Sequence, residues 1–267
     1  MGTVFGVYLK YVALSTMGFG AAYKHLTDDY EITAAAAFFL YMGVANGIIS
    51  ALFFLQKGMW VLGKDEKTGK IPLWSHVVWF GFHLPTQLYT FVHHYVLGHL
   101  FMVGAVVDAK TGKTTALPAA TEVVPGWYIG GKYSDELRMF KWGAIVDLTV
   151  EFNEACIGEC AVGGYKLVRC WDGVPPTPDQ LEDAAVHCAN AYHTAKVMGR
   201  RTPVLIHCAH GRGRSTTSMC AALVRAGLFD SWEAAFEACK KERPVVKLNG
   251  KMRKALTDWF SKYGKEE

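Results

Sequence analysis

The chain has 267 residues, 51% of them hydrophobic, and its 28 basic and 24 acidic residues give a net charge of +4. This balance is too even to indicate nucleic-acid binding, and the mean hydropathy of +0.12 is high for a soluble domain, so we look first for membrane segments. The seven cysteines are irregularly spaced, which favours reduced thiols facing the cytosol over a zinc site.

Residues 1–107 are apolar almost throughout and predict an all-α transmembrane region with several spans. The run from Ile32 to Leu55 holds 24 residues without a charge. At a rise of about 1.5 Å per residue, such a helix crosses a bilayer core of about 30 Å. The segment Thr3–Tyr23 is a second candidate span, although Lys10 lies near its middle. It lacks a basic leader and a cleavage site, so we do not expect a signal peptide.

Residues 72–107 form a further apolar stretch that is too long for one straight span. We expect two short spans or a re-entrant hairpin that turns near Pro85, because proline breaks a helix. The lysine-rich loop at 56–71 is expected in the cytoplasm by the positive-inside rule. Two crossings after this loop put the C-terminal half in the cytosol, whereas one crossing puts it outside. The five histidines of this stretch lack the spacing of metal ligands on one helix face, so we expect interfacial or interhelical polar contacts.

A linker is predicted at 108–121 and an α/β domain at 122–267, with a central sheet flanked by helices. Thr177 begins a capping box with proline at the first helical position, which predicts a helix ending at about Met198. Asp230 and Ser231 precede another predicted helix. Short β-rich runs occur at 127–132, 144–149, 165–170 and 204–208.

The segment VLIHCAHGRGRSTTS (204–218) carries the chemistry. A buried strand is predicted to end at Cys208, before a glycine turn and a helix from about Ser215. The N–H groups of such a turn and the positive helix N-terminus bind anions. The same field lowers a thiol pKa to roughly 3.5–7.5, so we expect Cys208 to be a thiolate at neutral pH. Arg214 can bind two phosphoryl oxygens, and Ser215 can hydrogen-bond the sulfur.

This Cys-x5-Arg-Ser pattern resembles the signature of the cysteine-dependent protein tyrosine and dual-specificity phosphatases. The resemblance covers roughly 121–267, and the short domain favours the dual-specificity branch. It implies a general acid on a loop before the nucleophile, where Asp172 fits and Asp179 is the alternative. Asp172 lies 36 residues before Cys208, although the family's usual proline between Trp171 and the acid is absent.

The resemblance also implies a mechanism that needs no metal and no organic cofactor. Cys208 forms a cysteinyl-phosphate, Arg214 stabilises the phosphoryl oxygens, Asp172 protonates the leaving oxygen, and Ser215 assists the sulfur. His207 is expected to orient the loop from behind. The substrate phosphate is expected to lie against Ala209, His210, Gly211, Arg212 and Gly213.

Four functions are compatible with these residues. The first is a multi-pass membrane phosphatase whose catalytic domain faces the cytosol and acts on phosphotyrosine, phosphoserine or phosphothreonine proteins. The second is a lipid phosphatase acting on a phosphoinositide or another phospholipid monoester, which His210 and Arg212 favour somewhat. A phosphate-binding protein without activity and a transporter with an appended phosphatase domain are less well supported. The sequence indicates neither the organelle nor the oligomeric state.

Overall fold

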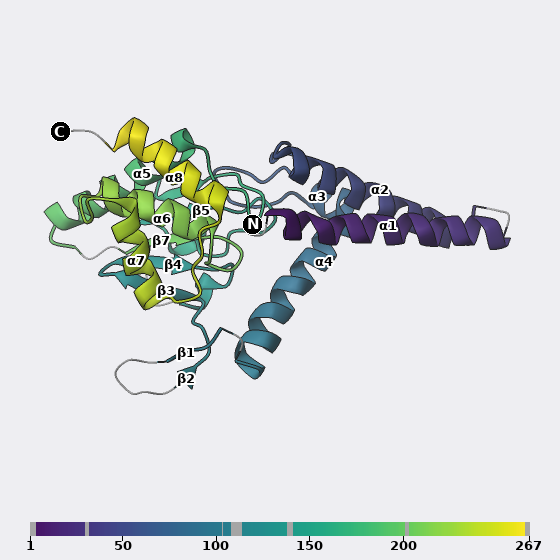
Figure 1. The fold of residues 1–267 in the computed structure, drawn as a ribbon, viewed down its shortest axis with the longest axis horizontal. Helices are drawn as coiled ribbons and strands as arrows, with labels where there is room; N and C mark the ends of the chain where they lie inside the picture. The colour runs from purple at the N-terminus through teal and green to yellow at the C-terminus, as the bar shows by residue number, and fades with distance from the viewer. Residues whose placement is uncertain are drawn as a thin grey trace.

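In the computed structural model, a long helical hairpin extends from one side of an α/β part formed by residues 120–264 (Figure 1). The structure describes residues 4–29, 32–102, 104–107, 114–137, 141–200 and 203–264. Thr3, the first residue of one expected span, lies outside the described residues, as do residues 108–113 of the predicted linker.

The hairpin consists of α1 (Val4–Asp29) and α2 (Ala34–Leu55), which pack side by side along their length. Their backbones approach closely at Gly18, where an added Cβ would lie 2.6 Å from the backbone nitrogen of Gly43. Within the described residues, α2 is the one helix that is long and apolar enough to cross a membrane. The expected span at 3–23 is therefore helical but fails this test, and the multi-pass prediction is not supported.

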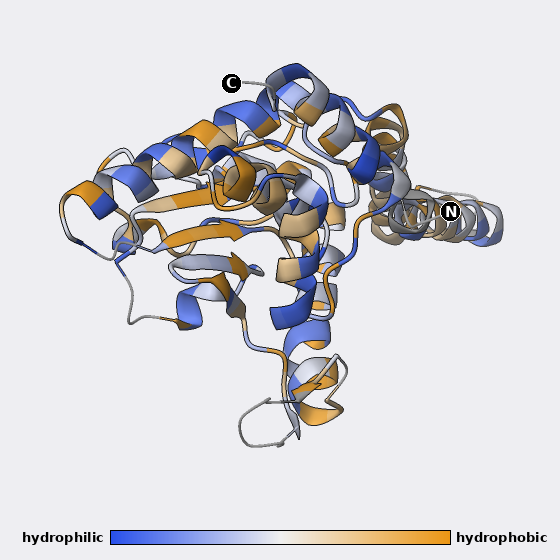
Figure 2. Cartoon of the chain, turned by 60° about the vertical axis from the view of Figure 1, so that its left-hand side comes forward, coloured by the Kyte–Doolittle hydropathy of each residue, from blue (hydrophilic) through white to orange (hydrophobic). Residues whose placement is uncertain are grey.

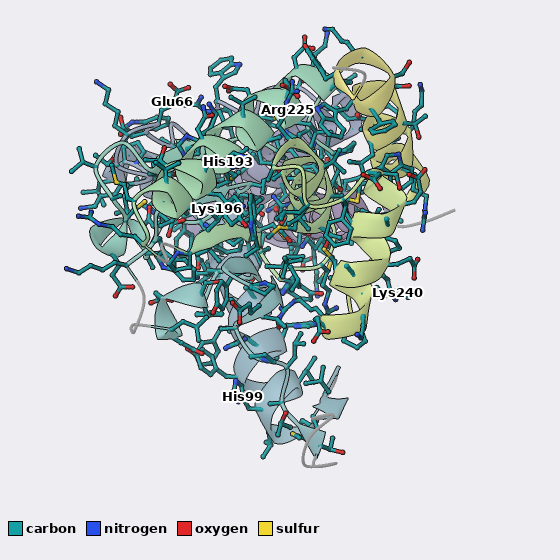
Figure 3. The ribbon with its side chains drawn as sticks, turned by 90° about the vertical axis from the view of Figure 1, so that its left-hand side faces the viewer. Glu66, His99, His193, Lys196, Arg225 and Lys240 are labelled. Carbon is teal, nitrogen blue, oxygen red and sulfur yellow. The ribbon has the colours of Figure 1, made fainter. Side chains whose placement is uncertain are left out.

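The segment after the hairpin contains α3 (Leu73–Val78), α4 (Phe80–Phe91) and a π-helix (Val92–Leu100). Figure 1 shows α4 leaving the base of the hairpin at a steep angle, and Figure 3 shows His99 at the far end of this arm. Strand β1 (Val106–Val107) follows and pairs antiparallel with β2 (Thr114–Thr115).

The predicted break at Pro85 is wrong. Helix α4 continues through Pro85, and the Gly81 carbonyl that the proline leaves without its backbone donor accepts a hydrogen bond from the Asn46 amide at 3.1 Å. The chain bends instead at Trp79, whose φ of −111° and ψ of 27° separate α3 from α4. With 6 and 12 residues, these helices are shorter than the ~20 residues that span a bilayer, so two crossings are not supported.

The α/β part contains a five-stranded sheet in the order β3-β4-β7-β5-β6. Strand β3 pairs antiparallel with β4, and all other pairs are parallel. Parallel pairing brings the carboxyl ends of β4, β5 and β7 to one edge of the sheet, and the chain leaves β7 there at Cys208. The strands are β3 (Ala120–Val124), β4 (Trp127–Gly130), β5 (Ala144–Asp147), β6 (Tyr165–Leu167) and β7 (Val204–His207).

Alternate side chains along each strand point to opposite faces of the sheet, so both faces of the sheet are apolar. Val204 and Ile206 of β7 pack into the large core that the helices share, whereas Leu205 faces a smaller core on the other side. Figure 2 shows the hydrophobic strands lying against the helices, whose buried residues belong to the core on the Val204 and Ile206 side. The α/β prediction with helices flanking a central sheet is confirmed. The helices are α5 (Pro178–Val197), α6 (Arg214–Arg225), α7 (Trp232–Glu242) and α8 (Gly250–Tyr263), with short 3-10 turns at Ser134–Glu136 and Ile157–Glu159.

Two helix starts were predictable from their capping residues. The Thr177 hydroxyl accepts from the Gln180 N–H at 3.2 Å, and the Gln180 side chain accepts from the Thr177 N–H at 2.9 Å. Ser231 caps α7 by accepting from the Ala234 N–H. Both predicted helix starts are confirmed.

A small apolar cluster joins the base of the hairpin to the α/β part. Phe53 of α2 and Trp171 have ring centroids 4.5 Å apart, and the Trp171 indole N–H donates to the Lys57 carbonyl at 2.8 Å. Residue 171 directly precedes Asp172, so the end of α2 contacts the loop that carries the predicted acid. The buried members of this cluster are Tyr11, Ile49, Phe53, Leu62, Phe82, Val150, Trp171 and Val174.

Candidate active site

The predicted nucleophile lies where β7 ends and the loop to α6 begins. The loop is tied to the neighbouring strand β4, since the Cys208 N–H donates to the Gly130 carbonyl at 3.2 Å. Gly211 has a φ of +64°, and an added Cβ would lie 2.7 Å from the Gly130 backbone. Glycine is therefore required at 211, both for its backbone angle and for this close approach.

Several groups stabilise a thiolate at Cys208. Its sulfur lies 3.4 Å from the Ser215 hydroxyl oxygen. Burial on its own raises the thiol pKa, but the Arg214 guanidinium, the Ser215 hydroxyl and N–H, and the Arg212 N–H together outweigh it and lower the Cys208 pKa. The seven cysteines are all free thiols.

Arg214 is held by a set of acceptors that the fold gathers around it. Only 1% of its side chain is exposed, and it donates to a Glu151 carboxylate oxygen at 2.7 Å and to Asp172 at 3.2 Å. It also donates to the carbonyls of Leu148 at 2.7 Å and Cys170 at 2.9 Å. A buried guanidinium needs such partners, so its orientation is fixed before substrate binds.

Asp172, and not Asp179, reaches this site. Burial raises the pKa of the Asp172 carboxyl, but Arg214 and, more weakly, His210 and Lys10 outweigh it, so the pKa is lowered. Asp179 lies on α5 and binds Lys262 at 2.6 Å and the Tyr263 hydroxyl at 2.8 Å, with 70% of its side chain exposed. The geometry therefore favours Asp172 as the acid.

A buried ionic network lies behind the loop. The His207 Nε2 atom lies 2.6 Å from a Glu154 carboxylate oxygen and 3.9 Å from an Asp147 carboxylate oxygen. Lys64, from the loop after α2, pairs with Asp147 and donates to the Thr149 carbonyl at 3.0 Å. Burial lowers the His207 pKa, but Glu154 and Asp147 outweigh it and raise that pKa to about 9.

The two carboxylates and the imidazole of this network are close enough to hold a metal ion. Lys64 already supplies a positive charge at Asp147, and His207 is protonated near neutral pH. These residues therefore do not fit a metal, because a ligating imidazole must be neutral and the carboxylates already have cationic partners. The network instead fixes the residue before the nucleophile.

The helical region covers the mouth of the site. A cavity over Asp172, Ala209 and His210 is closed on its other side by residues of α1, α2 and α4. The His93 ring lies 4.6 Å from that of His210, centroid to centroid. The helical residues that line this cavity are Lys10, Tyr11, Phe53, Phe82, Thr86, Tyr89 and Thr90.

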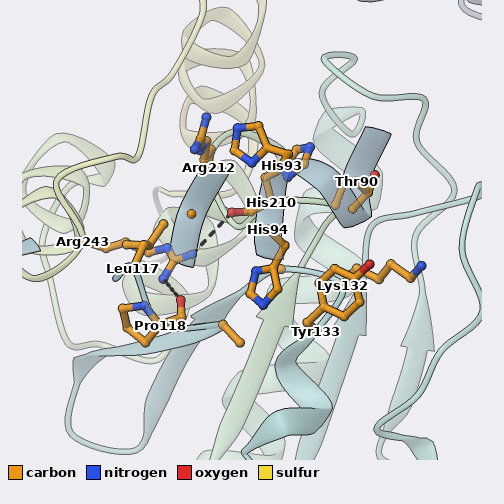
Figure 4. A pocket seen from close by; sticks show the side chains of 14 residues that line it. Thr90, His93, His94, Leu117, Pro118, Lys132, Tyr133, His210, Arg212 and Arg243 are labelled. Carbon is orange, nitrogen blue, oxygen red and sulfur yellow. Dashed lines mark hydrogen bonds between the residues drawn. The ribbon is translucent and has the colours of Figure 1, made fainter. Parts of the chain in front are cut away.

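A second pocket adjoins the first and shares Ala209 and His210 with it (Figure 4). Figure 4 shows His93 and Arg212 close together on one side and Arg243 facing Pro118 on another. Burial and the nearby His93, Arg212 and Arg214 outweigh Asp172 and lower the pKa of His210 to about 3. His210 is therefore neutral, and Arg212 provides the loop's charge beside this pocket.

The structure brings most of the predicted residues together. Ser215 lies at the sulfur, Gly213 precedes α6, and Ala209 and His210 line both pockets. Sequence reasoning missed Glu151, Lys64 and the placement of Lys10 at the site. An unpaired Arg214 in a buried motif was a signal that a carboxylate such as Glu151 had to lie nearby.

Comparison with known proteins adds a likeness in fold. No protein-family model and no curated protein matches the chain. Among solved structures, human DUSP28 is similar at 21% identity and a TM-score of 0.43, over 55% of this chain and 96% of that chain. DUSP15 is similar at 24% identity and a TM-score of 0.42, over 55% of this chain and 90% of that one. PTPMT1 in complex with PI(5)P is similar at 19% identity and a TM-score of 0.42, over 54% of this chain and 96% of that chain.

The chain resembles cysteine-dependent dual-specificity phosphatases. At these identities the likeness concerns the fold, and each match spans just over half of this chain.

Proposed function

We propose that the chain is a membrane-bound phosphatase that hydrolyses phosphomonoesters through a cysteinyl-phosphate on Cys208. The observation that carries this proposal is the buried thiol with a lowered pKa, beside Ser215 and at the start of a loop that leads to Arg214. Asp172 contacts the same guanidinium, so a nucleophile, an anion-binding group and an acid converge on one point.

In the first step, the Cys208 thiolate attacks phosphorus while the bond to the leaving oxygen breaks. Arg214 and the N–H groups of the loop stabilise the charge on the phosphoryl oxygens. Asp172 gives its proton to the leaving oxygen. Its pKa is low in the free enzyme because it faces Arg214, and a bound phosphoryl dianion offsets that positive charge, which favours the protonated carboxyl.

In the second step, water attacks phosphorus and the phosphorus–sulfur bond breaks. The Asp172 carboxylate accepts the proton of the water, and the Ser215 hydroxyl donates to the departing sulfur, which lies 3.4 Å away. The products are inorganic phosphate and the starting thiolate. His207 and Glu154 take no part in either proton transfer and hold the loop in position.

We also propose that α2 crosses a membrane with its Leu55 end on the cytosolic side, and that α1, which packs along α2, crosses beside it in the opposite direction. The length and composition of α2 support a span. A low-pKa thiolate that substrate can reach is readily oxidised, so the enzyme needs a reducing compartment, which is the cytosol in most cells. Membrane attachment then keeps the site next to membrane-associated substrates.

The test is to trap the intermediate on the full-length protein in detergent. Wild type should hydrolyse p-nitrophenyl phosphate, and acid quenching during turnover should leave a phosphate adduct on the peptide that contains Cys208. The Cys208→Ser variant should bind phosphate and keep the wild-type circular dichroism but show no turnover. Appreciable turnover by this folded variant would exclude Cys208 as the nucleophile.

A further inference from the structure

The ammonium of Lys10 makes no ion pair within 4 Å with any residue that the structure describes, although the carboxylates of Glu151 and Asp172 line the same cavity. It lies 4.9 Å from the ring centroid of Tyr11 and 4.8 Å from that of Tyr89, and the side chain is half-buried. No hydrogen bond or ion pair joins Lys10 to another residue in the part of the chain that the structure describes. A partly buried cation that is held only by ring faces can still gain a strong interaction from an anion.

Lys10 faces the reaction site. It lines the cavity that also contains Asp172, Ala209 and His210, so its ammonium lies on the side where the leaving group departs. It is close enough to Asp172 to act on the charge of that carboxyl. An anion that binds Lys10 therefore lies in the same cavity as Asp172 and the catalytic-loop residues Ala209 and His210.

The pocket beside this cavity also carries positive charge. Its charged side chains are Lys132, Arg212 and Arg243, whereas burial lowers the pKa values of His93, His94 and His210. Arg243 donates hydrogen bonds to the carbonyls of Gly211 and Pro118. The buried Nε of the Arg212 guanidinium makes no hydrogen bond with described residues. Together with Lys10, this pocket suits a substrate that carries negative charge beyond the phosphate being removed.

The walls around Lys10 are apolar and continue onto the surface of the helical region. Phe53, Phe82 and Tyr89 line the cavity, and all three come from α2 and α4. Outside it, Leu9, Phe54 and Leu55 near the base of the hairpin are each more than half exposed. Leu84 and Leu88 of α4 are also more than half exposed. Concentrated exposed apolar side chains mark surfaces that meet lipid or a partner.

The cavity at Lys10 and the exposed apolar side chains both lie near the base of the hairpin. The start of α1 and the end of α2 both lie against the α/β part, whereas the rest of the hairpin extends away from it (Figure 1). If α2 crosses a bilayer, the mouth of the site lies at the bilayer surface. A lipid headgroup can then enter the cavity while its acyl chains stay in the membrane beside the hairpin.

Building on the proposed phosphatase function, we infer that the substrate is an anionic phospholipid with a terminal phosphomonoester, and that Lys10 is a substrate-binding residue that selects it. The helical region thus completes the active site in addition to attaching it to the membrane. A phosphorylated protein would have to bring its phosphate between α1, α4 and the catalytic loop, where the lining contains aromatic rings, Lys10 and the carboxylates of Glu151 and Asp172.

The experiment compares three substrates on the full chain in detergent–lipid micelles. These are a phosphatidylinositol monophosphate, a phosphotyrosine peptide and p-nitrophenyl phosphate. Wild type should have a kcat/KM for the lipid at least tenfold above that for the peptide. Lys10→Met should lower kcat/KM for the lipid by about tenfold to a hundredfold, the worth of one charge-assisted contact, mainly through KM. Lys10→Arg should restore most of it, and the loss on p-nitrophenyl phosphate should be smaller.

Lys24→Met is the matched control, because it makes the same change on the exposed far part of α1 and should leave all three rates unchanged. Faster hydrolysis of the peptide than of the lipid would overturn the lipid assignment while the phosphatase function stands. An equal loss on all substrates in both Lys10 variants would reduce Lys10 to a structural role and overturn its assignment. Wild type without activity on p-nitrophenyl phosphate would refute the phosphatase function itself.

Discussion

The Trp171 indole N–H donates to the Lys57 carbonyl at 2.8 Å, which joins the residue before the predicted acid to the residues that follow α2. Phe53 packs on the same indole, and Arg169, two residues before Trp171, donates to the Lys64 carbonyl at 3.0 Å. The acid loop therefore rests on the helical region as well as on the sheet. A change in this loop is expected to alter the chemistry and leave the distant α5–α8 core intact.

Asp172→Ala should reduce kcat by about 10² to 10⁴, the usual contribution of a general acid. The loss should be large for an alkyl phosphate and small for p-nitrophenyl phosphate, whose leaving group needs little protonation. Steady-state kinetics with both substrates test this. Asp179→Ala is the control, because Asp179 binds Lys262 and Tyr263 on the exposed side of α5. If Asp179→Ala shows the leaving-group dependence and Asp172→Ala does not, the other carboxylate is the acid.

The Lys64–Asp147 pair should contribute strongly to stability because both side chains are buried, at 1% and 0% exposure. Lys64→Met leaves the Asp147 carboxylate without its closest cation and should lower the free energy of unfolding by about 3 to 5 kcal/mol. Urea denaturation in mild detergent, followed by tryptophan fluorescence, measures this loss. It should also lower kcat, since the pair lies behind the catalytic loop.

Two further variants separate the buried pair from the loop around it. Lys67→Met changes an exposed lysine of the same loop and should be neutral. Lys64→Met combined with Asp147→Asn should recover part of the lost stability, because the double variant no longer buries an unpaired charge. A Lys64→Met protein as stable as wild type would show that the pair contributes nothing net.

The local features of the site could be predicted from sequence, whereas its long-range partners could not. The strand before Cys208, the glycine turn and the capping box at Thr177 are encoded within a few residues, and each lies where it was expected. Glu151 and Lys64 are 63 and 83 residues from the partners they bind, and neither belongs to a short motif. Their roles follow from burial, which makes an unpaired charge costly, and burial depends on the whole fold.

Pro85 shows that a prediction from local sequence can also fail because a tertiary contact changes the outcome. Proline removes a backbone hydrogen bond, and sequence alone offered no substitute donor, so a break was expected. The Asn46 side chain, 35 residues before Gly81, supplies that donor once α2 packs against α4. A tertiary contact thus preserves a helix that the local rule would end.

Protonation of His207 should stabilise the fold at neutral pH. Burial opposes its charge, but Glu154 and Asp147 raise its pKa to about 9, above the ordinary value of about 6.5. The stabilisation is therefore full below pH 6.5 and is lost as pH rises through 9, by an amount on the order of 3 kcal/mol. Denaturation curves between pH 6 and 10 measure it.

The Cys208→Ser background is the right one for this measurement. The lowered pKa of the Cys208 thiol adds stability as pH rises, which is the opposite sign, and the substitution removes it. His207→Asn in this background should flatten the decline between pH 6.5 and 9. His193→Asn is the control, because His193 lies exposed on α5 (Figure 3) and should leave the decline unchanged. An unchanged decline in His207→Asn would assign it to other groups.

The last prediction concerns membrane topology. The loop at 56–71 contacts the α/β part directly, through Lys64 and through the Lys57 carbonyl, so the two must lie on the same side of any membrane. The start of α1 lies at the same place, since Tyr11 belongs to the cluster that contains Trp171. Protease-cleavable tags at residue 2, after the exposed Lys67 and at the C-terminus should therefore all be cleaved from the cytosolic face of sealed vesicles.

A second test asks whether α2 spans the bilayer. Alkaline carbonate should not extract the protein if α2 crosses the bilayer. A protected tag after Lys67 with a cleaved C-terminal tag would contradict these contacts, and release by carbonate would mean that α2 does not span.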